Sequence, residues 1–392
     1  MGRQRPEAGQ DHPLWFHAAS VGEVNMALPL MDAVHRRFPH FRLYLSTMTE
    51  TGQQAAARLL EGKGTTFFLP LDFPWTVSRI LGSLAPRALF VAETEIWPNL
   101  LRQCRRRRIP VVLFNGRISD RSFERYRRFR FFFREVIQGF AALAMQSGRD
   151  AERIIEIGAS PSRVRVTGNV KFDRPIPRLT AEEAGALRAG LGIKEKQRVF
   201  VAGSTHRGEE ELVLEAFRRL KQTEPSLVLI LAPRHLERLG EAIKALDRGG
   251  LCWTRKSQIS RDGPRADAVL LDTMGELGRI YGIGDVVFVG GSLVPVGGHN
   301  ILEPAAFGKP VLFGPHMENF REVARIIKAE GGGIEIRDQG QLFEETHRLL
   351  TDRSYYRRVG RAALRTIRNN QGASQKTLEI FEKYLKPGDA SP

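Results

Sequence analysis

The stretch Asp285–Phe320, DVVFVGGSLVPVGGHNILEPAAFGKPVLFGPHMENF, places the tightest limits on how this chain can fold. Its β-branched start, followed at once by two glycines, is typical of a buried strand that stops abruptly. A second glycine pair leads into HNILEP, which predicts a helix start with Pro304 in the first turn. Free backbone N–H groups at such a start, beside glycines that let a ligand come close, make an anion site. The competing interpretation is a capping box, in which Asn300 caps the helix and Glu303 reaches back.

The same order of strand, glycine or polar turn, and helix is repeated along the chain. It begins with LWFHAA at residues 14–19, which runs into SVGE and then into a helical pattern. Further strands are expected at residues 42–47, 65–69, 88–92, 111–115, 142–146, 199–202, 227–231, 268–271 and 285–289. Helices between strands favour parallel, doubly wound α/β domains, whose ligands lie beyond the carboxyl ends of the strands. No G-x-G-x-x-G follows the first strand and no Walker motif occurs, which argues against dinucleotide and nucleoside triphosphate sites.

A chain of 392 residues is long enough for two such domains. The segment RPIPR at residues 174–178 is typical of a linker because of its prolines. We therefore expect an N-terminal domain at residues 1–174 and a C-terminal domain at residues 175–392. The last helices of the chain either stay with the second domain or cross back to the first.

Charged residues near expected strand ends in the first half are candidates for chemistry. Glu23 lies at the first strand-to-helix turn, where it either serves a reaction or only favours the helix dipole, which would keep it ionised. Glu93 and Glu95 are two residues apart, so both face the same side of an extended segment. Glu93 is nearer the strand end and is our choice, although the pair stays open. Lys171, in GNVKFD, is expected at a strand end beside the linker.

The net charge of the chain and the spacing of its Cys and His residues limit the classes of ligand and partner that it could bind. The 60 Lys and Arg residues against 44 Asp and Glu give a net charge of +16, which implies nucleic acid, an acidic membrane or phosphorylated substrates. The two cysteines belong to no metal-spaced cluster and fit a reduced compartment. His17, His206, His235 and His299 lack metal-binding spacing, so no metal is expected. Two of them, His206 and His299, suit hydrogen bonds to a phosphate or carboxylate.

Basic and aromatic residues are mixed from Arg125 to Arg134. On a helix, the positions of one face that are expected in the core are Phe129, Phe132, Phe133, Val136, Ile137 and Phe140. Phe131 lies off that face, and with Arg105–Arg108 it either rests on anionic lipid or belongs to a solvated basic face. No apolar run approaches the ~18 residues of a transmembrane helix, and the start MGRQRPEAGQDHP does not resemble a signal peptide.

Together these motifs resemble those of the Kdo transferases, glycosyltransferases that move 3-deoxy-D-manno-octulosonic acid (Kdo) from its CMP ester onto lipid A precursors. The matching segments, spread over roughly residues 14 to 320, are HAASVGE, ETEIWPN, NGRIS, GNVKFD, GSTHRGEE, APRH, DTMGEL and GGSLVP to GPHMENF. The resemblance implies the GT-B fold, an α/β fold of two Rossmann-like domains facing a cleft. The family usually begins with an apolar anchor segment, and this chain departs from that pattern. We therefore expect a peripheral protein on the cytoplasmic face of the inner membrane.

The resemblance also implies roles for single residues. Glu23 would be the general base for the acceptor hydroxyl, while Glu93 and Lys171 would stabilise the transition state or orient the sugar acid. The positions that would hold CMP are Pro233, Arg234, Met274, Gly275, Glu276, Asn300, Ile301, Leu302 and Glu303. The expected reaction is an inverting transfer of Kdo from CMP-Kdo to lipid IVA in lipopolysaccharide assembly. CMP-Kdo is then a substrate, and we expect no cofactor, no metal and no nucleic-acid partner.

Two other functions stay open. Another GT-B enzyme that uses a UDP-sugar, such as lipid A disaccharide synthase or a UDP-sugar epimerase, would share the fold. It would not be expected to combine HAASVGE, ETEIWPN and DTMGEL. A basic membrane-binding or nucleic-acid-binding protein without catalysis would leave the glycine-rich strand ends unexplained.

Overall fold

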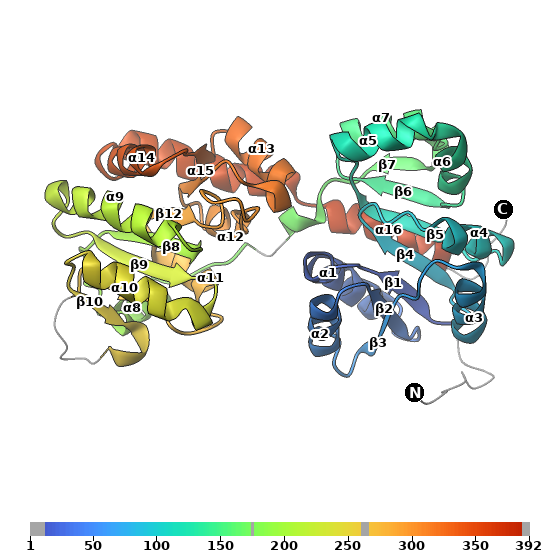
Figure 1. Ribbon diagram of the computed structural model, residues 1–392, viewed down its shortest axis with the longest axis horizontal. Helices are drawn as coiled ribbons and strands as arrows, with labels where there is room; N and C mark the ends of the chain where they lie inside the picture. Colours follow the sequence, from blue (N-terminus) through green and yellow to red (C-terminus); the bar gives the residue numbers. More distant parts are fainter. Residues whose placement is uncertain (1–11, 174–175, 260–265, 386–392) are drawn as a thin grey trace. The chain divides into compact units, whose positions relative to one another are not determined.

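The computed structural model describes residues 12–173, 176–259 and 266–385. The chain divides into two compact units, residues 1–174 with 370–392, and residues 175–369. Each unit is built on one seven-stranded sheet with helices packed against it (Figure 1). The chain start at residues 1–11 and the first two linker residues, Arg174 and Pro175, lie outside the described part.

The first unit contains a parallel sheet in the order β3-β2-β1-β4-β5-β6-β7. Its strands are β1 (Leu14–His17), β2 (Leu43–Thr47), β3 (Gly64–Phe68), β4 (Ala88–Ala92), β5 (Val111–Gly116), β6 (Ala142–Met145) and β7 (Val164–Val166). The central strands β1, β4 and β5 are fully buried, as expected for apolar strands covered by helices on both faces. Their carboxyl ends lie side by side at one edge of the sheet.

Two hydrophobic layers cover the faces of this sheet. The helices are α1 (Val21–Arg37), α2 (Glu50–Leu59), α3 (Pro74–Leu84), α4 (Pro98–Arg106), α5 (Asp120–Arg128), α6 (Arg130–Ile137), α7 (Gly148–Ile157) and α16 (Ala373–Leu385). Residues of α1, α2 and α16 pack with Phe16 and Phe90 on one face. Residues of α3, α4 and α7 pack with Trp15 and Leu89 on the other. Alternation along β1 and β4 thus sends neighbouring side chains into different layers.

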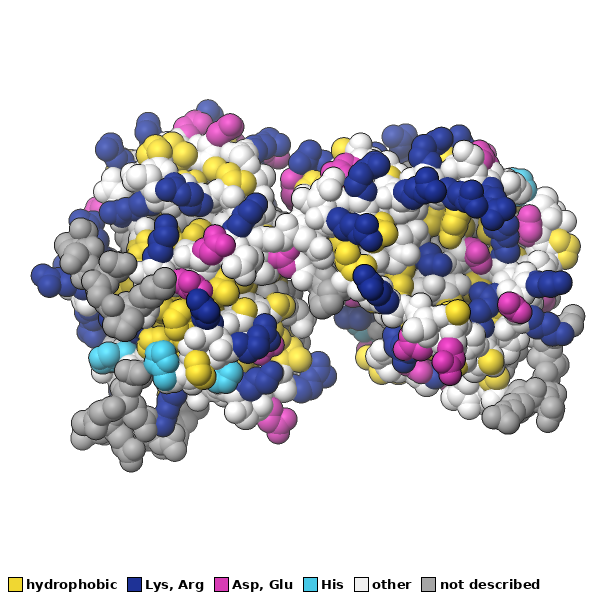
Figure 2. All heavy atoms as spheres, turned by 180° about the vertical axis from the view of Figure 1, so that it is seen from behind, with side chains coloured by type: hydrophobic (Ala, Val, Ile, Leu, Met, Phe, Trp, Pro, Cys, Tyr) yellow, Lys and Arg dark blue, Asp and Glu magenta, His cyan; other side chains and the backbone are white. Residues whose placement is uncertain are grey.

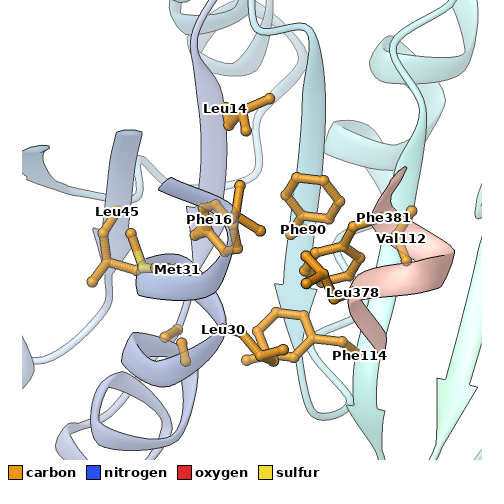
Figure 3. Close-up of a cluster of buried hydrophobic side chains, with 14 of the residues drawn as sticks. Leu14, Phe16, Leu30, Met31, Leu45, Phe90, Val112, Phe114, Leu378 and Phe381 are labelled. Carbon is orange, nitrogen blue, oxygen red and sulfur yellow. The ribbon is translucent and has the colours of Figure 1, made fainter. Parts of the chain in front are cut away.

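The last helix of the chain, α16, completes the core of the first unit (Figure 3). The Phe381 ring centroid lies 3.9 Å from that of Phe90 and 5.7 Å from that of Phe114. The Tyr384 hydroxyl donates to the Ala141 carbonyl at 3.0 Å. Asp173 accepts from the backbone N–H of Gly372 at 2.6 Å, just before α16 begins. Residues 370–385 therefore lie with the first unit, not with residues 175–369.

The second unit repeats the design with the strand order β10-β11-β9-β8-β12-β13-β14, again all parallel. The strands are β8 (Val199–Thr205), β9 (Val228–Pro233), β10 (Trp253–Arg255), β11 (Ala268–Leu270), β12 (Val286–Val289), β13 (Val311–Phe313) and β14 (Gly333–Glu335). The helices are α8 (Ala181–Gly190), α9 (Glu209–Thr223), α10 (Leu239–Arg248), α11 (Leu277–Ile280), α12 (Leu302–Ala306), α13 (Arg321–Ala329), α14 (Gln339–Thr351) and α15 (Arg353–Asn370). Residues of α9, α10, α14 and α15 pack on one face of the sheet, around Phe200 and Phe288.

The structure confirms the expected doubly wound α/β fold and corrects the local prediction for residues 122–140. Instead of one helix with one apolar face, α5 ends at Arg128 and α6 starts at Arg130. Phe129 and Phe132 are 47% and 45% exposed, whereas Phe140 is buried. Phe129 and Phe132 therefore lie outside the core, whereas the other expected positions, Phe133, Val136, Ile137 and Phe140, pack in it as predicted. The three-residue strands β7, β10 and β14 were not predicted, because runs so short carry little periodicity.

No helix within residues 12–173, 176–259 and 266–385 has both the length and the apolar character needed to span a membrane.

Candidate active site

Glu23 lies in the first turn of α1, just beyond the carboxyl end of β1. Ser20 caps this helix, and its hydroxyl donates to Glu23 Oε1 at 3.1 Å. The other oxygen, Oε2, accepts from the Ala19 backbone N–H at 2.9 Å. Both oxygens are therefore held in a fixed orientation by the turn itself.

The acidity of Glu23 differs from the expectation based on the helix dipole. Burial, and next the negative charge of Glu93, raise the pKa of Glu23 from 4.5 to about 7. The hydrogen bonds from Ala19 and Ser20 act in the opposite direction and offset only part of this. A carboxyl group that titrates near neutral pH is a better general base than one with an ordinary pKa. The dipole alone is thus a poor guide, because desolvation is the larger effect.

Glu93 contacts two cations, one of which follows the neighbouring strand. It follows β4, and its side chain is 12% exposed. Glu93 Oε2 accepts from Arg117 Nε at 2.9 Å, and Oε1 lies 3.8 Å from Lys171 Nζ. Arg117 follows β5, which neighbours β4. The fold therefore brings together the predicted pair Glu93 and Lys171, and it adds Arg117, which was noted only within the NGRIS segment.

The local geometry also separates Glu93 from Glu95. The backbone of Glu93 is left-handed, with φ at 51°, so the chain turns here and is not extended as predicted. Burial, and next the charge of Glu93, raise the pKa of Glu95. No ion pair joins Glu95 to any residue that the structure describes, whereas Glu93 contacts two cations. Glu93 is accordingly the carboxylate tied to the cationic groups.

A network of buried amide side chains positions Lys171, which lies in a 3₁₀ turn (Val170–Asp173) and not at a strand end as expected. Asn115 Oδ1 accepts from the Val170 N–H, and Asn169 Oδ1 accepts from the Lys171 N–H, both at 3.0 Å. Gln146 links the two, donating to the Asn115 carbonyl at 2.9 Å and accepting from Asn169 Nδ2 at 3.0 Å. Sequence reasoning missed this network, although a polar Asn or Gln at the end of an apolar strand is a usable signal.

His17 belongs to the core and not to a metal site. It is fully buried at the end of β1, with Nδ1 2.9 Å from Ser46 Oγ. Burial lowers the pKa of His17 to about 4, so the ring is neutral at pH 7. In the described parts of the chain, no three His, Cys, Asp or Glu residues gather in a way that could hold a metal ion.

In the second unit, the glycine loop after β12 is held by Glu209, the first residue of α9. This carboxylate is fully buried and accepts four backbone N–H groups. Oε2 accepts from His206 at 2.9 Å and Gly291 at 2.7 Å, and Oε1 accepts from Ser292 at 3.0 Å and Leu293 at 2.9 Å. Glu209 thus ties the ends of two adjacent strands together, a role that sequence reasoning did not assign to the GEE segment.

Two histidines lie against this loop. His206 Nε2 and His299 Nε2 are 2.8 Å apart, and the rings stack with centroids 5.0 Å apart. Burial, and next the charge of Arg234, lower the pKa of His299 to about 4. Gly291 has φ at 66°, and a Cβ there would approach His299 Cδ2 to 2.9 Å. A glycine is needed at this position for both reasons.

The segment Asn300–Glu303 does not form the capping box that was one of its two interpretations. The cap of α12 is Ile301, with no side-chain cap bond. Asn300 Oδ1 instead accepts from the Leu302 N–H at 3.1 Å, and Asn300 Nδ2 donates to Glu303 Oε1 at 3.0 Å. The side chains of Ile301 and Leu302 are buried, so only their backbone groups are available to a ligand.

The remaining predicted donor residues lie at the carboxyl ends of β9 and β11. Pro233 is the buried last residue of β9, and the exposed Arg234 follows it, its N–H bonded to the Thr205 carbonyl at 3.0 Å. Met274 is 71% exposed, and Gly275 has φ at 84°.

Glu276 is engaged within its own unit. Both of its carboxylate oxygens lie 2.5 Å from Lys256 Nζ. This pairing lowers the pKa of Glu276. Lys256 is a further residue that sequence reasoning missed, since nothing in its local sequence marks it.

Comparison with known proteins identifies the family. Residues 1–174 match the family model described as 3-deoxy-D-manno-octulosonic-acid transferase (kdotransferase). Along its length, the chain is 34% identical to the 3-deoxy-D-manno-octulosonic acid transferase of Haemophilus influenzae, covering 95% of this chain and 87% of that protein. The chain belongs to the Kdo transferase family. The transferase of Bordetella pertussis is 32% identical, covering 95% of this chain and 87% of that protein.

The fold of this Kdo transferase is also found in a glycosyltransferase and in a UDP-sugar epimerase of known structure. A glycosyltransferase from Rickettsia africae matches with a TM-score of 0.64 and 12% identity, covering 96% of this chain and 100% of that one. The UDP-GlcNAc 2-epimerase of Neisseria meningitidis, bound to UDP-GlcNAc, matches with a TM-score of 0.62 and 11% identity, covering 95% and 99%. These likenesses concern the fold, which is GT-B with two Rossmann-like units.

Proposed function

We propose that this Kdo transferase moves Kdo from CMP-Kdo onto a hydroxyl of the lipid A precursor lipid IVA, with inversion at the anomeric carbon. The single observation that carries the proposal is the oriented Glu23 carboxyl group, whose pKa is raised to about 7. As general base it removes the acceptor proton while the hydroxyl attacks the anomeric carbon and CMP leaves from the opposite face. Membership of the Kdo transferase family supports Kdo as the transferred sugar, and the Glu23 carboxyl group supports transfer assisted by a general base.

In the first unit, Glu93 and Lys171 act through their charges on the sugar acid and on Glu23. The Lys171 ammonium, 3.8 Å from Glu93 Oε1, is a cation suited to the carboxylate of the sugar acid. Glu93 keeps this ammonium in place and, through its own charge, raises the pKa of Glu23. Lys171 therefore contacts the sugar acid, while Glu93 supports both Lys171 and the base.

In the second unit, CMP binds at the carboxyl ends of β8, β9, β11 and β12. Arg234 offers a guanidinium for the phosphate, and the backbone N–H group of Ile301 offers a further donor. Glu303 and Glu276 accept from hydroxyl groups of the nucleoside or sugar. Met274 covers an apolar face of the ligand. The stacked His206 and His299 pair donates a hydrogen bond to the ligand. Because the pKa of His299 is lowered to about 4, this ring is neutral at pH 7 and adds no charge.

The donor needs no metal ion or other cofactor in this proposal. CMP-Kdo carries a single phosphate, so there is no diphosphate for a divalent ion to bridge. Charge that develops on the leaving phosphate is instead taken up by cationic side chains and backbone N–H groups.

We propose that the protein works at the cytoplasmic face of the inner membrane as a peripheral protein, with anionic lipid and not nucleic acid as its partner. In the first unit, α4 and α6 border a groove of about 310 Å³, lined by Arg102, Arg105 and Phe132. Phe131, which precedes the groove residue Phe132 in the sequence, is 82% exposed. Of the predicted Arg105–Arg108 set, Arg107 is engaged elsewhere, donating to the Ser78 carbonyl at 3.0 Å and hydroxyl at 2.8 Å.

Mass spectrometry of the products tests the reaction. The protein is incubated with lipid IVA and preformed CMP-Kdo, with and without excess EDTA. A product heavier by one or more Kdo units, formed equally in both samples, is expected. No product from CMP-Kdo, with transfer from a UDP-sugar instead, would show that the donor is wrong. Loss of product in EDTA, restored by a divalent ion, would overturn the metal-free mechanism.

A further inference from the structure

Helix α15 carries six arginines and no acidic residue. All six are exposed, and we call them the arginine face: Arg353, Arg357, Arg358, Arg361, Arg365 and Arg368. At 3.6 residues per turn they fall within an arc of about 140°. The opposite side of the helix, including Val359, Ala363 and Ile367, is buried.

Electrostatics within the chain oppose this arrangement. Within the ranges the structure describes, no carboxylate forms an ion pair with any member of the arginine face, and only Arg358 has an aromatic partner, the Tyr355 ring at 5.0 Å. Arginines four residues apart repel one another, and Arg353 lies at the helix start, where the dipole disfavours a cation. Several arginines on other helices of the same unit do form ion pairs, as in Arg325 with Glu322 at 2.7 Å.

A hollow of about 400 Å³ adjoins the first turn of α15. Its lining includes Arg353 and Tyr356 together with Lys196 and Arg198, which are exposed just before β8. Two carboxylates also line it, Glu195 and Asp285, and the latter is occupied by the Val199 N–H at 2.8 Å.

The hollow lies at the amino ends of β8 and β12, the opposite sheet edge from Glu209, Arg234 and Asn300. It is therefore distinct from the proposed donor site.

Figure 2 shows Lys and Arg side chains gathered on the upper part of the unit drawn on the right, which is the second unit.

We propose that the arginine face of α15, with the adjoining hollow, docks on the surface of an anionic phospholipid bilayer. The support is charge complementarity: guanidinium groups bind phosphate in a bidentate manner, and a helix of 18 residues, about 27 Å long, reaches several headgroups. No large apolar side chain of α15 is exposed, so the contact is with headgroups and not with acyl chains. The choice of lipid over nucleic acid rests on the proposed function, in which the acceptor is a lipid.

Vesicle flotation tests the docking. The triple variant Arg357→Gln/Arg361→Gln/Arg365→Gln removes three positive charges from the face. The matched control Arg218→Gln/Arg248→Gln/Arg325→Gln removes three from arginines that pair with Glu215, Glu211 and Glu322. With phosphatidylglycerol-containing vesicles we expect the first variant to bind at least tenfold more weakly than the control, and the difference to shrink at high salt. Equal binding by the two variants would overturn the proposal.

A local probe separates this face from other basic surfaces of the chain. In a Cys252→Ser background, an environment-sensitive dye is placed at Ser354→Cys, between the arginines, or at the control Ser226→Cys, both exposed positions. Anionic vesicles should change the emission at position 354 and not at 226, while zwitterionic vesicles change neither. An unchanged signal at 354, or a change there with duplex DNA but not with vesicles, would show that lipid is not the partner.

The outcome is independent of the transfer reaction. If the probe responds but no Kdo product forms, the proposed reaction fails and the docking stands. If product forms with a short-chain acceptor in detergent while the probe and the triple variant show no effect, the docking fails and the reaction stands.

Discussion

At the scale of single residues, the chemistry of this protein depends on how the fold treats one carboxyl group. Glu23 receives two hydrogen bonds, from Ala19 and Ser20, which favour its ionised form. Burial and the nearby Glu93 favour the protonated form more strongly, so the pKa rises from 4.5 to about 7. The shift costs on the order of 3 kcal/mol in the ionised state, at 1.36 kcal/mol per pKa unit. The ionised form of Glu23 is therefore less stable, and more basic, than that of a surface glutamate.

Glu23→Gln keeps the size of the side chain and removes its negative charge. We expect turnover to fall on the order of a hundred- to ten-thousand-fold, the usual loss for a general base. CMP should still raise the melting temperature, because the donor residues lie in the other unit. Steady-state kinetics beside thermal shifts measures both. Turnover within about threefold of the wild type would show that Glu23 only serves the helix start, and Glu93 would be the next candidate.

The pH profile reports the same group. The base is active when ionised, so kcat/KM should rise with pH and level off above a pKa of about 7. Glu93→Gln removes the negative charge that has the larger effect on Glu23, which should lower the pKa of Glu23 and move this limb to lower pH. Glu95→Gln should move it less, since the effect of Glu95 is the smaller one. A limb that stays in place in both variants would contradict the assignment.

Arg234 and Glu303 test the donor site. Arg234→Ala and Glu303→Ala should each weaken CMP binding by roughly 1–3 kcal/mol, the usual cost of a lost charged hydrogen bond. Because Glu303 is bonded to Asn300 Nδ2 and not to a helix cap, its replacement should affect affinity more than folding. Calorimetry with CMP beside a denaturant melt distinguishes the two effects. Arg207→Ala, at an exposed arginine two residues before α9 begins, is the control and should bind CMP normally.

At the scale of elements, one buried carboxylate joins two strand ends of the second sheet. The loop after β12 would otherwise present several unpaired N–H groups, and unpaired buried donors are costly. Glu209 satisfies those of Gly291, Ser292 and Leu293 together with that of His206. The adjacent Glu210 differs: burial raises its pKa to about 7, and it accepts from the Thr205 hydroxyl at 3.1 Å.

These neighbours make a matched pair of variants. Glu209→Gln leaves one oxygen for four donors and turns an amide NH₂ toward N–H groups, so it should cost on the order of 2–5 kcal/mol of unfolding free energy. CMP affinity should fall with it, because the glycine loop loses its support. Glu210→Gln replaces a group that is easily protonated and should cost less than about 1 kcal/mol. Chemical denaturation compares them, and equal losses would mean that the four bonds do not govern the loop.

At the scale of the whole molecule, the last helix of the chain belongs to the core built by the first 174 residues. Phe381 packs among Phe16, Phe90 and Phe114, so residues 12–173 and α16 fold as one body. The unit formed by residues 175–369 is in this sense inserted between them.

Phe381→Ala should therefore destabilise the first unit. The fully buried ring leaves a cavity whose cost is about 3–5 kcal/mol. Hydrogen exchange should accelerate in β1, β4 and β5 while β8, β9 and β12 stay protected. Phe131→Ala, at a ring that is 82% exposed, is the control and should change stability by less than about 0.5 kcal/mol. Faster exchange in the second sheet instead would contradict this assignment of α16.

Much of the fold was readable in the sequence, because it rests on local patterns. β-Branched runs that end in glycine or polar turns, separated by helical periodicity, predict parallel βα units, and most strands appear within one or two residues of their expected bounds. The carboxyl ends of such strands meet at one edge of each sheet, so Glu23 and Glu93 in the first unit and Arg234 in the second were identifiable as candidates. The short strands and the break at Phe129 escaped, since a few residues carry too little periodicity to decide between conformations.

Only the tertiary structure decided what these candidates are. The pKa of Glu23 depends on its burial and on the charge of Glu93. The ion pair of Glu93 with Lys171 depends on the arrangement of four strands, and the support of the glycine loop depends on Glu209. The place of Phe381 in the first core follows in the same way from contacts across the whole chain. Desolvation and charge–charge effects act over distances in space, so a pattern along the sequence determines the elements but not the environment that these elements create for one another.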